Sequence, residues 1–278
     1  MGKTAFVLSM AKNMAVNFNT PVALFSLEMS NVQLVNRLIV NVCEIPGEKI
    51  KSGRLESYEW EQLDFKIKEL YDAPIYVDDT PSLSVFELRT KARRLVREHG
   101  IKIIIIDYLQ LMNASGMSFG SREQEVSTIS RSLKGLAKEL NIPIIALSQL
   151  NRGVEARQGA EGKRPQLADL RESGAIEQDA DMVCFIHRPE YYKITEDERG
   201  NSLIGLAEII IAKHRNGAVG DVRLRFKSEF AKFMNVDEDV PVREFSSNMN
   251  SSGPMETMPP IPPAGTDFLA PGNNEVPF

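Results

Sequence analysis

The chain has 278 residues, of which 42% are hydrophobic and 26% are charged, and its formal net charge is −5. This is the composition of a globular protein with one large or two small domains, and Cys43 and Cys184 are too few for a disulfide scaffold. No apolar run approaches the ~18 residues of a membrane-spanning helix and no secretory leader opens the chain, so we expect no membrane association and a cytoplasmic setting.

Helical and strand-like apolar patterns alternate along the sequence. In chain order they predict a helix over Thr4–Phe18, a strand over Pro21–Leu27, a helix capped by Ser30, a helix over Glu56–Tyr71, a strand over Pro74–Val77, a helix over Ser84–His99, a strand over Lys102–Ile106, a helix over Glu123–Leu140, and strands over Pro143–Leu147, Met182–His187, Ala207–Lys213, Val222–Phe226 and Ala231–Val236. The last two strands are expected to form a β-hairpin. This alternation predicts an α/β fold with a mostly parallel, twisted sheet flanked by helices.

The composition changes after Phe245. The segment 246–278 contains no Lys or Arg and seven of the 15 prolines. Such a segment buries too little apolar surface to offset its conformational entropy. We therefore expect a folded domain over residues 1–245 and a disordered tail over 246–278.

Gly2-Lys3-Thr4 stands at the start of the first predicted helix. This is the closing half of a phosphate-binding loop, in which helix N–H groups and a lysine hold phosphates and a Thr hydroxyl faces Mg²⁺. An ordinary helix with a lysine in its first turn is the alternative interpretation. Asp107 directly follows a buried isoleucine strand, where a carboxylate can hold the water shell of Mg²⁺. An aspartate that only ends a strand is the alternative.

Two further polar residues follow strands of the same predicted sheet. Glu28 is placed to polarise an attacking water, or is simply an acid near a helix N-terminus. Gln149 is placed to bond a γ-phosphate, or is an ordinary surface residue. Because the carboxyl ends of parallel strands meet at one edge of a sheet, we expect these residues to converge with Lys3 and Asp107 around one triphosphate pocket.

Six stretches closely resemble the C-terminal motor domain of bacterial replicative DNA helicases of the DnaB family. They are Met1–Phe6, Phe25–Ser30, Ile104–Met112, Ile144–Arg152, Asp169–Asp181 and Ile211–Gly217. The resemblance covers residues 1 to about 236. It implies a RecA-like, P-loop ATPase core that works as a homohexamer, hydrolyses ATP with Mg²⁺ at subunit interfaces, moves 5′ to 3′ on single-stranded DNA and unwinds the replication fork. It also implies primase and a helicase loader as primosome partners in the bacterial cytoplasm.

The resemblance implies a role for each matching residue. Gly2, Lys3 and Thr4 are implied to bind phosphate, and Thr4 and Asp107 to hold Mg²⁺ through water. Glu28 is implied to be the catalytic glutamate, and Gln149 to sense the γ-phosphate. Lys213 and Arg215 are implied to reach the neighbouring subunit's ATP site, and the residues implied to contact DNA are Arg171, Glu172 and Gly174. The alternative for residues 213–215 is a solvated strand end. For residues 113–121, a second pore loop and a plain connection both stay open.

Three further expectations concern the start of the chain, its alternative functions and its C-terminal end. A full phosphate loop begins earlier than Met1, so we expect a chain truncated inside that loop, without the preceding strand and weakly active or inactive. The alternative function is a non-catalytic helicase fragment that acts through ring or partner interfaces, and a recombinase-type ATPase is a rival within the same fold. The ending at Phe278 is either an anchor for a partner protein or a terminus without a role.

Overall fold

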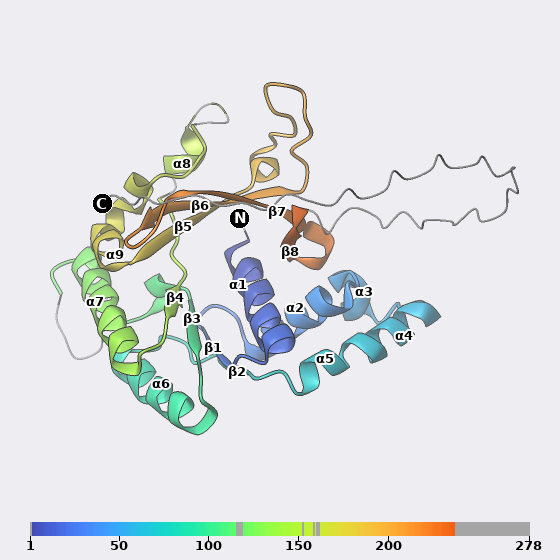
Figure 1. Cartoon of the computed structure of the whole chain (residues 1–278), viewed down its shortest axis with the longest axis horizontal. Coiled ribbons are helices and arrows are strands. Elements are labelled where there is room, and N and C mark those ends of the chain that lie inside the picture. Colours follow the sequence, from blue (N-terminus) through green and yellow to red (C-terminus); the bar gives the residue numbers. More distant parts are fainter. Residues whose placement is uncertain (1, 115–118, 152, 158, 160–161, 237–278) are drawn as a thin grey trace, which may run out of the picture. The chain divides into compact units, whose positions relative to one another are not determined.

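The computed structural model describes residues 2–114, 119–151, 153–157, 159 and 162–236, without the side chains of residues 171–173. These residues belong to one unit, Met1–Val240. The predicted tail over 246–278, with Phe278, lies outside the described residues. Within the described part of the chain, eight strands form two four-stranded sheets (Figure 1).

The first sheet is entirely parallel. Its strands are β1 (Val22–Ser26), β2 (Ile75–Asp78), β3 (Ile103–Asp107) and β4 (Ile144–Ala146), in the order β2-β1-β3-β4. All four strands were predicted from apolar runs. In the ladder between β1 and β3, Ser26 pairs with Asp107, so the chain following β1 and the carboxylate that ends β3 meet at the same edge.

The isoleucine strand β3 serves two cores because successive side chains point to opposite faces of a sheet. Ile104 and Ile106 pack in one cluster with α6 (Val85–His99) and α7 (Arg122–Leu140). Ile103 and Ile105 pack in another with α1 (Lys3–Lys12) and α2 (Asn31–Cys43). The sheet therefore lies between α6 and α7 on one face and α1 and α2 on the other (Figure 1). This confirms the α/β class and the helical covering of both faces.

The helix starts follow the capping signals of the sequence. The Ser30 side chain and the Gln33 side chain cap the first turn of α2 reciprocally, and Ser84 accepts a hydrogen bond from the Glu87 N–H at the start of α6. The helix predicted over Glu56–Tyr71 is divided into α4 (Ser57–Lys66) and α5 (Lys68–Tyr71). The first predicted helix continues from α1 into a π-helical turn over Asn13–Asn17.

Several short elements carried no periodic signal in the sequence. They are α3 (Gly47–Ser52), α8 (Gly153–Ala156), α9 (Gly174–Asp179) and the 3-10 turns Leu109–Leu111, Leu167–Ser173, Pro189–Tyr192 and Ser228–Phe230. Each has only one or two turns, too few residues for a 3.6-residue period to be visible. No helix in the described ranges is both long and apolar enough to span a membrane.

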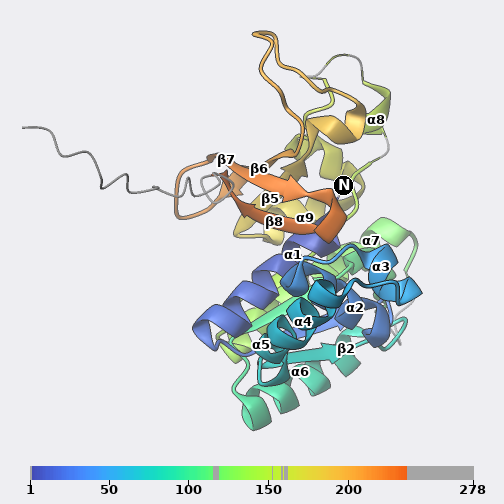
Figure 2. The same cartoon turned by 90° about the vertical axis from the view of Figure 1, so that its right-hand side faces the viewer.

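The second sheet is antiparallel. It contains β5 (Met182–His187), β6 (Leu206–His214), β7 (Gly220–Lys227) and β8 (Lys232–Asn235) in sequence order (Figure 2). The predicted hairpin is confirmed as the β7–β8 pair. The sequence predicted one mostly parallel sheet, whereas half of the strands form this separate ladder; connections between β6, β7 and β8 are short, and short connections join antiparallel neighbours.

A buried hydroxyl attaches the second sheet to the helices of the first. The Ser9 hydroxyl of α1 accepts hydrogen bonds from the Asn41 side chain of α2 at 3.1 Å and from the Phe233 backbone N–H of β8 at 3.2 Å. Ser9 and Asn41 are both buried. Phe6 and Phe233 add an edge-to-face contact, with ring centroids 5.3 Å apart. These contacts fix α1 against β8.

Candidate functional site

The N-terminus of α1 lies at the carboxyl edge of the parallel sheet. Gly2 precedes the helix with φ of +99°, a conformation that strains any residue with a Cβ. A Cβ at this position would also lie 3.5 Å from the Phe233 ring and 3.9 Å from Arg188 Nη1. The first N–H groups of a helix have no partners within the helix, and together with its dipole they attract anions. The turn is therefore suited to an anionic ligand.

Thr4 and Asp107 are joined directly. The Thr4 hydroxyl donates a 2.6 Å hydrogen bond to Oδ2 of Asp107, which is only 1% exposed. Thr4 comes from the first turn of α1, and Asp107 is the last residue of β3. A buried carboxylate beside a hydroxyl is a set of hard oxygen ligands.

Lys3 lies near Asp107, Glu28 and the residues that follow β4. Its ammonium group donates a 3.0 Å hydrogen bond to the Ser148 carbonyl and lies 5.3 Å from the centre of the Tyr108 ring. Burial lowers the pKa of Lys3, and the negative charges of Asp107 and Glu28 partly oppose this shift. The lysine is thus held as a partly desolvated cation next to two carboxylates, where a phosphate would compete strongly for it.

Glu28 reaches the same edge from β1. The Leu27 N–H donates a 2.8 Å hydrogen bond to the Asp107 carbonyl, which fixes the backbone on which Glu28 stands. Glu28 is exposed, and its charge acts on Lys3. An exposed carboxylate next to a buried one can act as a base while the other holds a cation.

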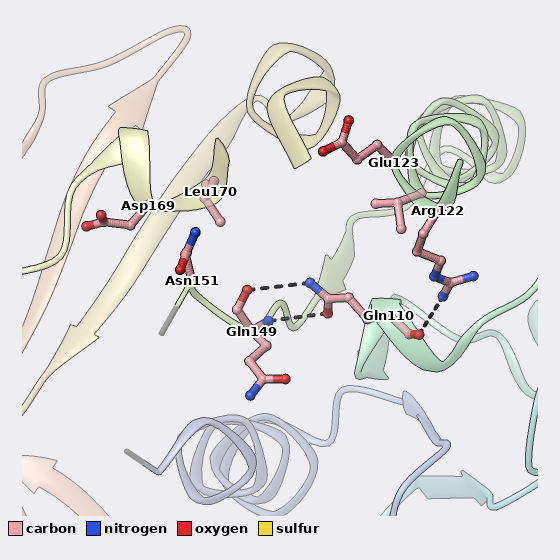
Figure 3. Close-up of a pocket in the computed structure, with 8 residues that line it drawn as sticks. Gln110, Arg122, Glu123, Gln149, Asn151, Asp169 and Leu170 are labelled. Atoms are coloured by element: carbon pink, nitrogen blue, oxygen red, sulfur yellow. Dashed lines mark hydrogen bonds between the residues drawn. The ribbon is translucent and has the colours of Figure 1, made fainter. Parts of the chain in front are cut away.

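Gln149 follows β4 and completes the group. Its backbone N–H donates to Oε1 of Gln110 at 3.3 Å, and its exposed side chain points away from Gln110, towards the ribbon of α1 (Figure 3). The neighbouring residue Ser148 binds Lys3 through its carbonyl. The structure therefore brings together Lys3, Thr4, Glu28 and Asp107, with Gln149 beside them, as the sequence predicted.

The donor set suits Mg²⁺ held largely by phosphates and water. In the described part of the chain, no three His, Cys, Asp or Glu residues cluster as a metal site of their own. Thr4 and Asp107 offer one hydroxyl and one carboxylate, and Mg²⁺ in nucleotide sites typically takes one or two such ligands while the substrate and water fill the rest. Thr4 and Asp107 are the residues that would hold this ion.

Lys213 and Arg215 lie elsewhere in the chain. Lys213 donates to the Glu177 carbonyl, and Arg215 forms a 3.1 Å ion pair with Asp181. In the β5–β6 ladder Lys213 pairs with Val183, whereas Arg188, near Gly2, follows the other end of β5. Five residues of strand separate these ends by about 16 Å. Within the described part of the chain, the side chains of Lys213 and Arg215 bond Glu177, Gln178 and Asp181, and none of these belongs to the group of Lys3, Thr4, Glu28, Asp107 and Gln149.

The predicted DNA-contacting residues are described only in part. Gly174 is exposed and begins α9, while the side chains of Arg171 and Glu172 lie outside what the structure describes. The preceding turn is well held: Asp169 is buried, forms an ion pair with Arg157, and accepts a hydrogen bond at its carbonyl from the Asn151 N–H at 3.1 Å. Of the predicted loop over 113–121, residues 115–118 lie outside the described ranges.

The sequence did not single out four residues next to this site. They are Tyr108 under Lys3, Ser148, Gln110, and Arg188, whose guanidinium lies 3.8 Å from the centre of the Phe226 ring. Ser148 acts through a backbone carbonyl, which every residue has, so no sequence signal could have found it. Gln110 had a weak signal as the polar residue in the apolar run Tyr108–Met112.

Comparisons with known proteins agree with this geometry. Residues 1–235 match the family described as DnaB-like helicase C terminal domain. The chain is 51% identical, over 237 residues, to the replicative DNA helicase DnaB of Geobacillus stearothermophilus, a match that covers 85% of the chain and 50% of the relative. The chain thus spans about half the length of this curated relative.

Two solved structures are similar. One, described as an ATPase domain, superposes with a TM-score of 0.77 at 43% identity, covering 84% of this chain and 81% of that one. A DnaB-like replicative helicase, whose structure was described with its interactions with primase, superposes with a TM-score of 0.77 at 44% identity, covering 85% of this chain and 55% of that one.

Proposed function

This chain belongs to the family of DnaB-like helicase C-terminal domains, and from that premise we propose that it binds Mg²⁺·ATP at the Lys3 group and hydrolyses it to drive movement on single-stranded DNA. The observation that supports this most is the convergence of Lys3, Thr4 and Asp107 through hydrogen bonds at the edge of the parallel sheet.

Each residue has a distinct part in the proposed reaction. Lys3 and the first N–H groups of α1 neutralise the phosphates, and Gly2 lets the backbone approach them. Glu28 takes the proton from the attacking water, and the Gln149 amide donates to the γ-phosphate. Thr4 and Asp107 would hold Mg²⁺, which would supply charge stabilisation to the phosphates.

The separation of Lys213 and Arg215 from this site supports an assembly in which ATP lies between copies. A guanidinium stabilises charge on a transferring phosphoryl group only at close range. We propose that Arg215 serves as the finger, and Lys213 as its companion, in the site of the next subunit of a homohexamer. Movement in the 5′ to 3′ direction, DNA contacts from Arg171, Glu172 and Gly174, and primase and loader partners belong to the same proposal. The weak turnover that the sequence predicts for the chain by itself stays a prediction.

The test is ATP hydrolysis by the chain with and without single-stranded DNA. Glu28→Gln should lower turnover by a factor of about 10² or more without weakening nucleotide binding. Glu61→Gln, an exposed acid on α4, is the matched control and should leave turnover unchanged. Equal turnover in Glu28→Gln and the unsubstituted chain would refute the assignment of the base. Nucleotide binding with no turnover in either would support the non-catalytic alternative.

A further inference from the structure

Gln110 extends the parallel sheet where its backbone ladder stops. The ladder between β3 and β4 continues past the strands: the Leu147 N–H donates to the Ile106 carbonyl, and the Leu109 N–H donates to the Leu147 carbonyl, both at 2.9 Å. One residue further, backbone pairing ends at the 3-10 turn Leu109–Leu111. There the side chain of Gln110 makes the next contacts with the chain that follows β4.

A carboxamide carries the same donor and acceptor as a peptide group, so a Gln side chain can act as an additional rung. The Gln110 Nε2 donates to the Ser148 hydroxyl at 2.8 Å and to the Gln149 carbonyl at 3.5 Å, and the Gln110 Oε1 accepts from the Gln149 N–H at 3.3 Å. Figure 3 shows the two bonds with Gln149. Gln110 is half-buried, whereas Gln149 is exposed. The turn that carries the exposed Gln149 is thus held by three hydrogen bonds from one side chain.

Ser148 is held by two residues from different elements. Its carbonyl accepts from Lys3, which reaches it from the nucleotide side, and its hydroxyl accepts from Gln110. A phosphate would compete for the Lys3 ammonium, since anionic oxygens form stronger hydrogen bonds with it than a carbonyl does. With Lys3 drawn towards phosphate, Gln110 would remain as the contact that keeps this turn in place.

The same residue is tied to the start of α7. Arg122 Nη2 donates to the Gln110 carbonyl at 2.5 Å and to the Met112 carbonyl at 3.1 Å. Arg122 also pairs with Glu125, and Glu125 accepts from the Ala114 N–H at 3.1 Å. Gln110, Arg122 and Gln149 line a common cavity of about 290 Å³ together with Asp169 and Leu170, which precede the predicted DNA-contacting residues (Figure 3).

We infer that Gln110 is a positioning residue of the proposed ATP site: its side-chain amide fixes the Ser148–Gln149 turn and joins it to Arg122 at the start of α7. This inference rests on the proposed function for the role of Gln149, whereas the contact itself can be tested without nucleotide. No hydrogen bond among the described residues joins the Gln110 side chain to Lys3, Thr4, Glu28 or Asp107, and Gln110 acts on these residues through Ser148 and Gln149.

The test measures hydrogen exchange of the Gln149 amide by NMR in the full 278-residue chain without nucleotide. Gln110→Met keeps the length of the side chain and removes all three hydrogen bonds to the turn, and should accelerate exchange at Gln149 by about tenfold. Gln110→Glu keeps the acceptor for the Gln149 N–H and should retain the protection. Gln62→Met is the matched control, because the Gln62 side chain also donates to a backbone group, the Cys43 carbonyl, but does not bond the Ser148–Gln149 turn.

Unchanged exchange in Gln110→Met, or equal acceleration in Gln110→Met and Gln110→Glu, would overturn the inference. Exchange in β1 shows whether each variant is folded. If Gln110→Met does not fold, the unsubstituted chain decides: cross-relaxation between the Gln110 side-chain amide protons and the Ser148 Hβ protons supports the contact, and its absence refutes it.

A second arm adds Mg²⁺ and a non-hydrolysable ATP analogue. In the unsubstituted chain the analogue should slow exchange at Gln149 and at residues 112–114, and in Gln110→Met the effect at residues 112–114 should be lost. No response in the unsubstituted chain would count against the proposed function and leave the result of the first arm intact. A response at residues 112–114 that survives Gln110→Met would refute the link to Arg122.

Discussion

The Thr4 hydroxyl donates a 2.6 Å hydrogen bond to Asp107, a residue 103 positions away that is buried at the end of β3. This bond joins the first turn of the first helix to the centre of the parallel sheet. It places a hydroxyl and a carboxylate where the anion-attracting helix end and the sheet edge meet, and the proposed use of Mg²⁺ depends on this pair.

Removal of the Thr4 hydroxyl should weaken the dependence of nucleotide binding on Mg²⁺. Thr4→Val keeps the size of the side chain and removes one of two protein oxygen ligands, so Mg²⁺ should raise the affinity for a fluorescent ATP analogue less than in the unsubstituted chain. Thr128→Val is the matched control, since the Thr128 hydroxyl only bonds the Gln124 carbonyl within α7. An equal Mg²⁺ effect in Thr4→Val and the control would contradict the assigned role.

Lys3 should lower the free energy of unfolding of the chain, although nucleotide binding requires it. Burial lowers its pKa, so the folded chain disfavours the charged form and the unfolded chain binds the proton more readily. Lys3→Met should therefore raise the free energy of unfolding at pH 7 by about 0.5–2 kcal/mol while removing nucleotide binding.

The gain should shrink as pH rises. As pH rises above the lowered pKa, the Lys3 amine becomes neutral in the folded chain while the unfolded chain still binds the proton, so the burial penalty shrinks. The penalty is gone only above the ordinary pKa of 10.5, where the amine is neutral in both states. Urea denaturation at pH 7 and pH 9.5 measures this, with the exposed Lys102→Met as control. A loss of stability in Lys3→Met at pH 7 would show that the bond to Ser148 outweighs desolvation.

Two inactive variants should restore each other if Arg215 acts between subunits. Arg215→Ala alone and Glu28→Gln alone should each lose most ATP turnover. A mixture of the two should regain a measurable fraction, because some interfaces combine an intact Glu28 with an intact Arg215. Arg97→Ala, on the exposed face of α6, should behave as unsubstituted protein in the same mixtures. Mixtures no more active than the separate variants would place Arg215 outside the neighbouring site.

Loss of the buried Ser9 hydroxyl should lower the free energy of unfolding more than loss of a hydroxyl that bonds only its own helix. Ser9→Ala leaves the Phe233 N–H and part of the Asn41 amide without their shared acceptor in a buried position, at a cost of about 1–3 kcal/mol. Ser132→Ala removes a hydroxyl that bonds only its own helix and should cost about 0.5 kcal/mol or less. Equal unfolding midpoints in urea for the two variants would contradict the attachment through Ser9.

Most of the fold was predictable because its signals are local. Each strand that the structure describes was predicted from an apolar run. Ser30 and Ser84 were predicted to cap the helices that begin after them, α2 and α6. The separation into two ladders was not predictable, because pairing depends on contacts between distant residues. The alternation of the four buried residues Ile103–Ile106 between two core clusters is likewise invisible in a run of four identical residues.

The part of the candidate site that consists of charged side chains at the ends of helices and strands was predictable. Lys3, Asp107 and Glu28 stand at element ends, and the topology of a parallel sheet brings such ends together. Ser148 contributes a carbonyl and Gln110 contributes a rung to the backbone ladder, and neither leaves a pattern in the sequence. The placement of Lys213 and Arg215 at the far end of β5 follows from strand register, which only the structure supplies.

Paramagnetic broadening of amide resonances by Mn²⁺·ATP tests the central claim most directly, because it detects binding even when affinity is weak. The account predicts the strongest broadening at residues 2–5, 28, 107–108 and 148–149, and its loss in Asp107→Asn. Broadening spread evenly over the chain, or centred away from these residues, would contradict a single nucleotide site at the edge of the parallel sheet.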